Sequence, residues 1–218
     1  MENGLIINME KNVINILKKV GAIITNSHIV LTSGRHTDAY INPDMLLPQA
    51  KEVSRVAKIF AGAFKTKNID VVVGPAIGGI VISTWVAYHL SKLKRKNILG
   101  IFTEKTPEND QVFDRGFEKL VKGKNILVVE DITTTGGSAK KAANSVKKAG
   151  GKVVAVSVIV NRDAKNVTSK TVGYPFKPLA VMKIDSFAEK DCPLCKKNIP
   201  INIEVGHGKE YLSKLNKS

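Results

Sequence analysis

Two adjacent carboxylic acids, Glu130 and Asp131, stand between an apolar run at residues 126–129 and a turn rich in hydroxyls and glycines at residues 132–138. The turn presents backbone N–H groups and threonine hydroxyls at the start of a predicted helix, which is a typical anion site. Two acids beside a bound phosphate would be repelled unless they bind something else. Ribose hydroxyls, or a Mg²⁺ ion carried by a polyphosphate, would satisfy them. The pattern therefore predicts a ribose-phosphate site.

Other interpretations of this segment fit less well. A strand that runs into a capped helix would account for Ser138 but not for the acid pair. The segment lacks the Gly-Lys-Thr/Ser of a Walker loop and the G-x-G-x-x-G of a dinucleotide fingerprint. Instead it resembles the phosphoribosyl pyrophosphate (PRPP) motif of type I phosphoribosyltransferases. The resemblance implies that PRPP is bound by Glu130, Asp131, Ile132, Thr133, Thr134, Thr135, Gly136, Gly137 and Ser138.

Two earlier segments resemble the orotate phosphoribosyltransferases within that family. Residues 31–42 are similar to their N-terminal hood segment, and residues 74–80 are similar to their pyrophosphate loop, a glycine-rich turn between a strand and a helix. The resemblance implies substrate contacts for the small residues of both segments: orotate for Ser33 and Gly34, and PRPP for Gly78 and Gly79.

Arg162 follows the next predicted strand, where this family has an arginine that contacts orotate. An arginine binds a carboxylate through two parallel hydrogen bonds, and a purine acceptor has no anionic group to offer there. The resemblance assigns Thr134 to orotate as well. A phosphoribosyltransferase for a purine or for uracil, and a non-catalytic regulator that senses PRPP, remain the alternatives.

A polar stretch at residues 104–123 interrupts the alternation of apolar runs and helices, and such a long loop in a compact domain is usually functional. It resembles the mobile catalytic loop of the family at Lys105. Its Arg-Gly-Phe at residues 115–117, with the Cys-Pro-Leu-Cys at residues 192–195, resembles one branch of the orotate phosphoribosyltransferases. The resemblance implies that Lys105 and Arg115 close over the pyrophosphate and act in catalysis together with Glu130 and Asp131.

The elements that must position these groups alternate short apolar runs with amphipathic segments, which predicts an α/β fold. Runs that are apolar throughout are typical of a mainly parallel sheet flanked by helices, which binds ligands at the carboxyl ends of its strands. Residues 28–46 are predicted to be irregular. The expected strands are 71–73, 98–102, 126–129 and 153–160, and the expected helices are 10–20, 49–65 and 138–149.

The resemblance implies the type I phosphoribosyltransferase fold as a single domain over residues 1–218. A small hood, from about residues 1–46 and 178–218, would cover a core at about residues 47–177 with a mobile loop at about 104–123. It also implies a homodimer whose loop reaches the neighbouring subunit's site. The implied reaction transfers the phosphoribosyl group from PRPP, with its Mg²⁺, to orotate, giving orotidine 5′-monophosphate and pyrophosphate in pyrimidine biosynthesis.

The composition is strongly basic, with 34 Lys and Arg against 19 Asp and Glu and a net charge of +15. The basic residues are mostly lysines scattered over predicted helices, which favours a solvated surface over a nucleic-acid site. No apolar run is long enough for a membrane span, and the N-terminus carries acids where a signal peptide carries bases. A cytoplasmic protein that binds neither membrane nor nucleic acid is therefore expected.

The two cysteines, Cys192 and Cys195, form a single C-x-x-C pair and cannot build a disulfide framework. The pair is either a reduced structural pair or half of a zinc site that His207 or another subunit would complete. Because no second pair stands at a useful spacing, the reduced pair is favoured and no metal ligands are assigned in the protein, and Mg²⁺ is expected only as carried with PRPP.

Overall fold

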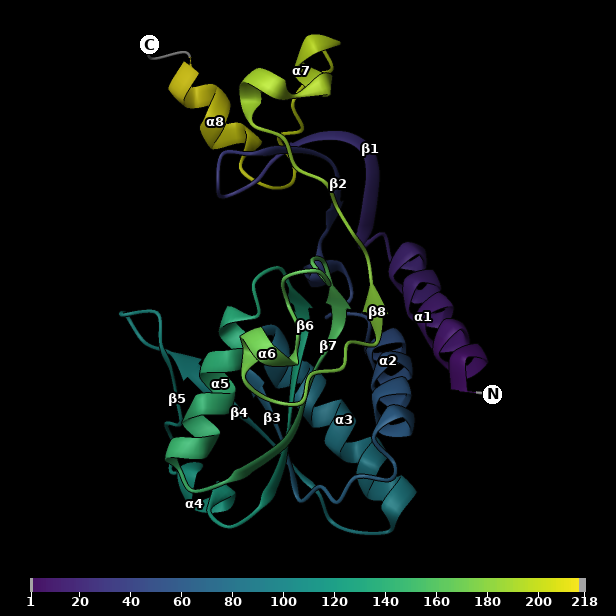
Figure 1. Ribbon diagram of the computed structural model, residues 1–218, viewed down its shortest axis with the longest axis vertical. Helices are drawn as coiled ribbons and strands as arrows, with labels where there is room; N and C mark the ends of the chain where they lie inside the picture. The colour runs from purple at the N-terminus through teal and green to yellow at the C-terminus, as the bar shows by residue number, and fades with distance from the viewer. Residues whose placement is uncertain (1, 216–218) are drawn as a thin grey trace.

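The computed structural model describes residues 2–215 and contains a six-stranded sheet in the order β5-β4-β3-β6-β7-β8 (Figure 1). All neighbouring strands are parallel except β5, which pairs antiparallel with β4 at one edge. The predicted α/β fold with a mainly parallel sheet is confirmed. The strands of this sheet are β3 (Val71–Pro75), β4 (Leu99–Lys105), β5 (Gln111–Val112), β6 (Asn125–Thr133), β7 (Lys152–Asn161) and β8 (Ala180–Val181).

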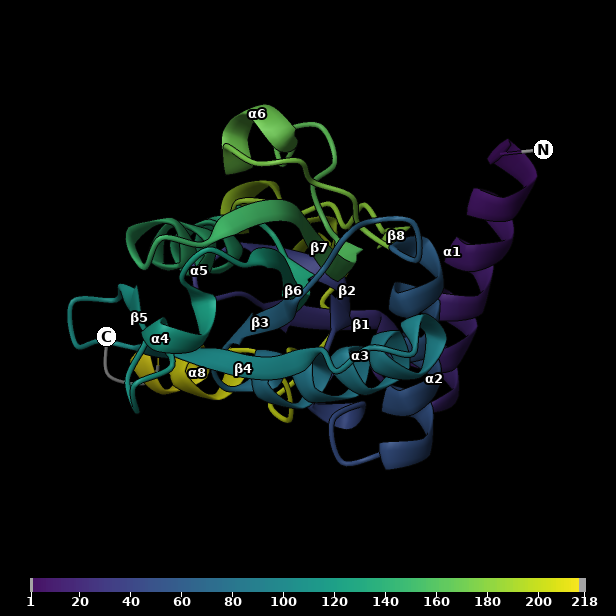
Figure 2. The same ribbon diagram turned by 90° about the horizontal axis from the view of Figure 1, so that it is seen from below.

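Helices cover both faces of this sheet (Figure 2). On one face, Val72, Leu127 and Val129 pack with apolar residues of α1 (Glu2–Lys19), α2 (Ala50–Ala63) and α3 (Gly78–Lys94). On the other face, Val71 and Val128 pack against α5 (Gly137–Lys148). Because successive side chains point to opposite faces and both faces are buried, the strands are apolar throughout. The predicted strands and helices are all present, with their ends shifted by a few residues except at the start of α1.

The irregular structure predicted for residues 28–46 is wrong over most of that range. β1 (Ile23–Val30) and β2 (His36–Ile41) form an antiparallel hairpin that stands apart from the main sheet. The register shifts between Thr25 and Ile29, and Asn26 has a φ of 55°. This bulge breaks the alternation of apolar and polar residues by which a strand is recognised in a sequence.

The C-terminal tail folds over this hairpin, and the two form the hood above the sheet (Figure 1). Backbone hydrogen bonds join His36 to Phe187 in both directions at 2.8 Å, and the Asn202 amide donates to the His28 carbonyl at 2.7 Å. The tail contains the short helices η2 (Glu189–Asp191), α7 (Pro193–Lys196) and α8 (Gly208–Leu215).

The hood is smaller than the expected residues 1–46 and 178–218. Helix α1 belongs to the core instead, because its side chains at Val13, Ile16 and Leu17 are buried in the main core. The hood therefore begins with β1, and its C-terminal part begins after β8. Met1 and residues 216–218 of the expected hood lie outside the described residues. No helix in the part of the chain that the structure describes is long and apolar enough to cross a membrane.

The expected loop at residues 104–123 contains regular elements. Its first two residues belong to β4, its middle forms β5, and its end contains α4 (Glu118–Val121). Gln111 anchors it, because this side chain is buried and accepts a hydrogen bond from the Thr103 hydroxyl at 2.7 Å. The remaining short helices of the core are η1 (Pro43–Met45) and α6 (Ser169–Val172).

Candidate active site

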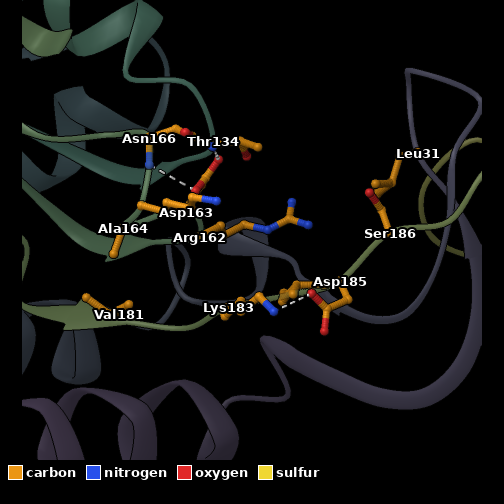
Figure 3. Close-up of a pocket in the computed structure, with 12 residues that line it drawn as sticks. Leu31, Thr134, Arg162, Asp163, Ala164, Asn166, Val181, Lys183, Asp185 and Ser186 are labelled. Atoms are coloured by element: carbon orange, nitrogen blue, oxygen red, sulfur yellow. Dashed lines mark hydrogen bonds and ion pairs between the residues drawn. The ribbon is translucent and has the colours of Figure 1, made fainter.

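Two cavities lie at the carboxyl ends of the central strands, where an open α/β sheet binds its ligands. The first, which we call the arginine cavity, has a volume of about 600 Å³ and is drawn in Figure 3. It is lined by Leu31, Thr134, Arg162, Asp163, Ala164, Lys165, Asn166, Val181, Lys183, Ile184, Asp185 and Ser186. The second, the lysine cavity, has a volume of about 660 Å³ and is lined by Asp44, Ala76, Ile77, Gly78, Ile80, Phe102, Glu104, Lys105 and Arg115.

Glu130 lies near the end of β6, where its side chain is buried behind the turn that begins α5. Burial raises its pKa to about 8, and the neighbouring Asp131 adds to the shift. Hydrogen bonds from the Ser138 hydroxyl and the Ala139 amide oppose this shift, because they favour the ionised form. Among the described residues, no cation forms an ion pair with Glu130. The site therefore holds a carboxyl group that an added cation or a set of hydroxyl donors would ionise.

Asp131, the second acid, lies between the phosphate turn and the loop after β3. Its pKa is also raised by burial, and Asp44 raises it further by repulsion. One carboxylate oxygen accepts a hydrogen bond from the Ile132 amide, and the other lies directly beside Gly78. A Cβ atom at Gly78 would collide with that oxygen. The structure thus brings Asp131 together with the predicted pyrophosphate loop.

The turn after the acid pair, residues 133–138, is built as its sequence predicts. The Thr133 hydroxyl oxygen accepts from the Gly136 amide at 2.7 Å and folds the turn back on the strand. Gly136 has a φ of 76°, and a Cβ atom added there would lie 3.1 Å from a methyl group of Val172 and 3.2 Å from one of Val167. Only glycine therefore fits without strain. Thr134 and Ser138 remain exposed, at the N-terminus of α5. Exposed hydroxyls and helix-end amides together suit a phosphate.

The loop after β3 is held against the strand by contact between backbones. A Cβ on Gly79 would approach the Cα of Gly74 to 2.8 Å, and a Cβ on Gly74 would collide with the backbone of Gly79. The Ala76 amide donates to the Thr103 carbonyl at 2.8 Å, the Ala76–Ile77 peptide is cis, and the Ile77 side chain is 80% exposed. Ala76, Ile77 and Gly78 of this loop line the lysine cavity.

The two predicted cations, Lys105 and Arg115, both line the lysine cavity. The Nε of Arg115 lies 2.7 Å from the Glu104 carboxylate and its guanidinium lies 6.0 Å from the centre of the Phe102 ring. The hydrogen bond with Glu104 raises the pKa of Arg115. This contact uses only the Nε, so the other N–H groups of the Arg115 guanidinium remain free to bind an anion.

Arg162 is half-buried and extends into the arginine cavity (Figure 3). Its buried Nε has no hydrogen-bond partner, and no described residue forms an ion pair with the guanidinium. Burial lowers its pKa because the charged form loses solvation. Thr134 of the phosphate turn lines the same cavity. An anion placed here would satisfy the guanidinium and lie close to a phosphate bound at the turn.

Not every predicted residue lies in these cavities. Ser33 and Gly34 are exposed in the turn between β1 and β2 and line neither cavity, whereas their neighbour Leu31 lines the arginine cavity. Their contact with orotate stays a prediction. Asp44 and Lys183 line the lysine and arginine cavities, respectively, and were not foreseen. Neither lies in a recognisable motif, so only the fold reveals them.

Comparison with known proteins identifies the family. The sequence model described as "Phosphoribosyl transferase domain" matches residues 42–180. The orotate phosphoribosyltransferase of Thermoanaerobacter sp. (strain X514) is 38% identical over 194 residues, which cover 88% of this chain and 96% of the relative. That of Caldanaerobacter subterraneus subsp. tengcongensis is 36% identical over the same shares. The chain belongs to the orotate phosphoribosyltransferase family.

The structure of Mycobacterium tuberculosis orotate phosphoribosyltransferase superposes with a TM-score of 0.63 at 22% identity, covering 78% of this chain and 96% of that one. This likeness confirms the type I phosphoribosyltransferase fold. The two cavities, the phosphate turn and the acid pair all lie at the carboxyl ends of the central strands, and their contacts with substrate stay a prediction. The domain match begins at residue 42, so β1 and β2 of the hood lie outside it.

Proposed function

We propose that this protein is an orotate phosphoribosyltransferase of pyrimidine biosynthesis, which transfers the phosphoribosyl group of PRPP to orotate. The observation that carries the proposal is Arg162, a half-buried guanidinium without a protein anion that extends into the arginine cavity. Orotate is a flat ring with a carboxylate, which matches the two-pronged hydrogen-bonding geometry of arginine. Thr134, from the phosphate turn, would contact the other side of the same ligand.

The remaining groups divide the substrate PRPP between them. The turn at residues 133–138 would bind the 5′-phosphate, and Glu130 and Asp131 would accept hydrogen bonds from the ribose hydroxyls. The backbone at Gly78 and Gly79, with Lys105 and Arg115, would bind the pyrophosphate. The orotate nitrogen then forms a bond to the anomeric carbon as the bond to pyrophosphate breaks, through an oxocarbenium-like state. The residues would act by holding and orienting the reactants and by stabilising the leaving group.

The acid pair also fits a Mg²⁺ ion carried by PRPP. Both carboxyl groups have raised pKa values in their buried surroundings, and no ion pair with a described residue compensates them. A hard cation bound by oxygen ligands or their waters would favour the ionised form of both groups. Glu130 and Asp131 would hold the ion, which when bound supplies positive charge to the pyrophosphate.

We also propose that the enzyme works in the cytoplasm, because PRPP is too highly charged to cross a membrane unaided. The proposal includes a homodimer in which the loop at residues 104–123 reaches the site of the neighbouring subunit. Lys105 and Arg115 line their own chain's lysine cavity in the single subunit, and in the dimer they would bind the pyrophosphate held by Gly78 and Gly79 of the neighbour. The segment that joins β4 to β5 projects from the edge of the sheet and supports this arrangement (Figures 1 and 2).

Mixed dimers test the exchange of loops between subunits. Lys105→Ala and Asp131→Asn should each have low activity alone. Coexpressed, they should regain about a quarter of the wild-type activity, since half of randomly formed dimers are mixed and contain one intact site of two. Light scattering would establish that the protein is a dimer, and native mass spectrometry that mixed dimers have formed. If these mixed dimers recover no activity, each loop serves its own subunit.

The acceptor is tested by offering orotate, uracil, adenine and hypoxanthine in parallel, each with PRPP and Mg²⁺. Only orotate should be consumed. Arg162→Ala should raise the KM for orotate about 10- to 100-fold, the loss of a charged hydrogen-bonding partner of about 1.5–3 kcal/mol. Arg162→Lys should recover part of this loss, and Arg95→Lys, at an exposed helix end, should match the wild type. Turnover of a purine with orotate inert would refute the proposal.

A further inference from the structure

Four potential metal ligands gather in the hood, away from both cavities. His28 comes from β1, His36 from the start of β2, and Cys192 and Cys195 from the tail at α7. Each offers one ligand atom, and the four atoms lie within 4.8 Å of one another. His28, His36 and Cys192 are buried, and Cys195 is partly buried. We propose that these four side chains hold a structural Zn²⁺ ion that fastens the tail to the hairpin.

Three sulfur–nitrogen distances in the cluster suit a tetrahedral site. The Cys195 Sγ lies 3.3 Å from the His36 Nδ1 and 3.6 Å from the His28 Nε2, and the Cys192 Sγ lies 3.8 Å from the same Nε2. A tetrahedron with ordinary Zn–S and Zn–N bonds has edges of about 3.4–3.8 Å. The two ring nitrogens are closer, at 2.7 Å, and a small rotation of either ring would separate them.

The hydrogen bonding of His28 directs a lone pair into the cluster. Its Nδ1 lies 2.7 Å from the Ile199 carbonyl oxygen, which only accepts, so this nitrogen carries the proton. The Nε2 is then the unprotonated nitrogen, and it faces both sulfurs. A zinc-bound histidine commonly donates its other N–H to a carbonyl in this way. The cluster thus includes an outer hydrogen bond of the kind that orients metal ligands.

The ligand set favours zinc and a structural role. Two thiolates with two imidazoles form a tetrahedral set that suits Zn²⁺, and four protein ligands leave no open position for a substrate. None of the four residues lines the arginine cavity or the lysine cavity. On binding, the two thiols would lose their protons to the solvent, and no oxidant is needed.

The C-terminal tail needs such an attachment because it has little apolar core of its own. Between residues 185 and 214, whose side chains the structure describes, only Cys192 and Gly208 are buried. Small folding units without an adequate core are commonly stabilised by a metal or by disulfides. The Cys-x-x-Cys pair could instead form a disulfide, but this would join two residues three apart in the tail and leave it unattached to the hairpin.

His207, which the sequence suggested as the completing ligand, does not belong to the cluster. Its Nε2 lies 2.9 Å from the Thr32 hydroxyl oxygen, at the exposed tip of the hood. His207 is therefore a matched control, since it is a hood histidine that the proposed site does not use.

The experiment measures metal in the purified protein by mass spectrometry with inductively coupled plasma. We expect one zinc ion per chain in the wild type and in His207→Ala, and loss of zinc in His36→Ala and Cys195→Ser. Cys195→His, which keeps a ligand, should retain zinc. Because the variants without zinc could also unfold, circular dichroism and the phosphoribosyltransferase activity with saturating orotate should be recorded for each.

Cobalt substitution gives a second readout that does not depend on a variant's folding. The wild type, stripped with a chelator and reloaded with Co²⁺, should show the visible absorption of a tetrahedral ion and a thiolate-to-cobalt charge-transfer band. A wild type that holds no zinc and produces neither band would overturn the proposal. Two cysteines joined in a disulfide in protein purified without reductant, or zinc loss in His207→Ala equal to that in His36→Ala, would overturn it as well.

Discussion

Glu130 is a residue whose ionised form is expected to serve substrate binding but to destabilise the free protein. Its pKa is about 8 in the folded protein, against 4.5 for an ordinary glutamate, because the carboxylate is buried next to Asp131. In the free protein at pH 7 the group is mostly protonated. The protonated carboxyl favours the folded state fully below about pH 4.5, where the unfolded chain is protonated too. This contribution to the free energy of unfolding falls as the pH rises from about 4.5 to about 8, because the unfolded chain ionises first, and it is lost above about 8, where the group ionises inside the fold. A ligand that brings hydroxyl donors or a cation removes this cost.

Glu130→Gln should therefore stabilise the free protein in alkali while reducing its activity. Through this group, the free energy of unfolding of the wild type changes by at most about 1.4 kcal/mol per pH unit. Urea unfolding between pH 5 and 9 should show the variant gaining on the wild type up to about pH 8. Asp131→Asn and Glu130→Gln should each lower turnover about 10²-fold, the usual loss for a preorganised electrostatic contact. Parallel stability curves, or a fully active double variant, would contradict this account.

Among the elements, the β4-β5 hairpin and the turn after it carry the two cations of the lysine cavity. Gln111 anchors the hairpin, whereas Lys105, Arg115 and most of the neighbouring side chains are exposed. The ion pair between Arg115 and Glu104 is itself largely exposed, so it contributes little to folding. In a closed site that excludes water, the same cations would attract pyrophosphate much more strongly. The element is therefore suited to open and close.

We predict that PRPP with Mg²⁺ protects residues 104–123 from proteolytic nicking. Lys105→Ala and Arg115→Ala should lower turnover at least tenfold and leave the unfolding midpoint nearly unchanged, because exposed cations stabilise the fold by less than about 1 kcal/mol. Lys119→Ala, an exposed lysine of the same segment, should behave like the wild type in both assays. Equal cleavage rates with and without ligand, together with full activity of the first two variants, would mean that this element is not a lid.

At the scale of the whole molecule, the hood and the core share the arginine cavity. Leu31 and Ser186 reach it from the hood, opposite Arg162 from the core (Figure 3). Leu31 follows Val30, which pairs with His36 in the hairpin, and Ser186 precedes Phe187, whose backbone is hydrogen-bonded to His36. Both cavity residues are therefore adjacent to residues that His36 holds in place. The Arg35 Nε also donates to the Ser186 hydroxyl at 2.9 Å. Loosening the hood should thus disturb the orotate side of the site first.

Removal of zinc with a chelator is predicted to raise the KM for orotate severalfold and to change the KM for PRPP little, because the phosphate turn belongs to the core. Re-addition of Zn²⁺ should restore the wild-type value. Limited proteolysis of the zinc-free protein should cut the tail between residues 188 and 207 before the core. An equal rise of both KM values would place the effect of the metal in the core and not in the hood.

The features that could be predicted from the sequence are local ones. The apolar runs of the central strands, the acid pair and the turn at residues 133–138 each lie within a few neighbouring residues, where periodicity and backbone geometry decide the structure. The bulge in the β1-β2 hairpin and the packing of α1 into the core, and not into the hood, depend on tertiary contacts. The sequence pattern did not reveal either of them. His28 and His36 lie beside Cys192 and Cys195, and Leu31 and Arg162 line one cavity from opposite sides, although each set joins segments more than a hundred residues apart. Only the tertiary fold decides such arrangements, because side chains that distant in sequence come together through the packing of whole elements.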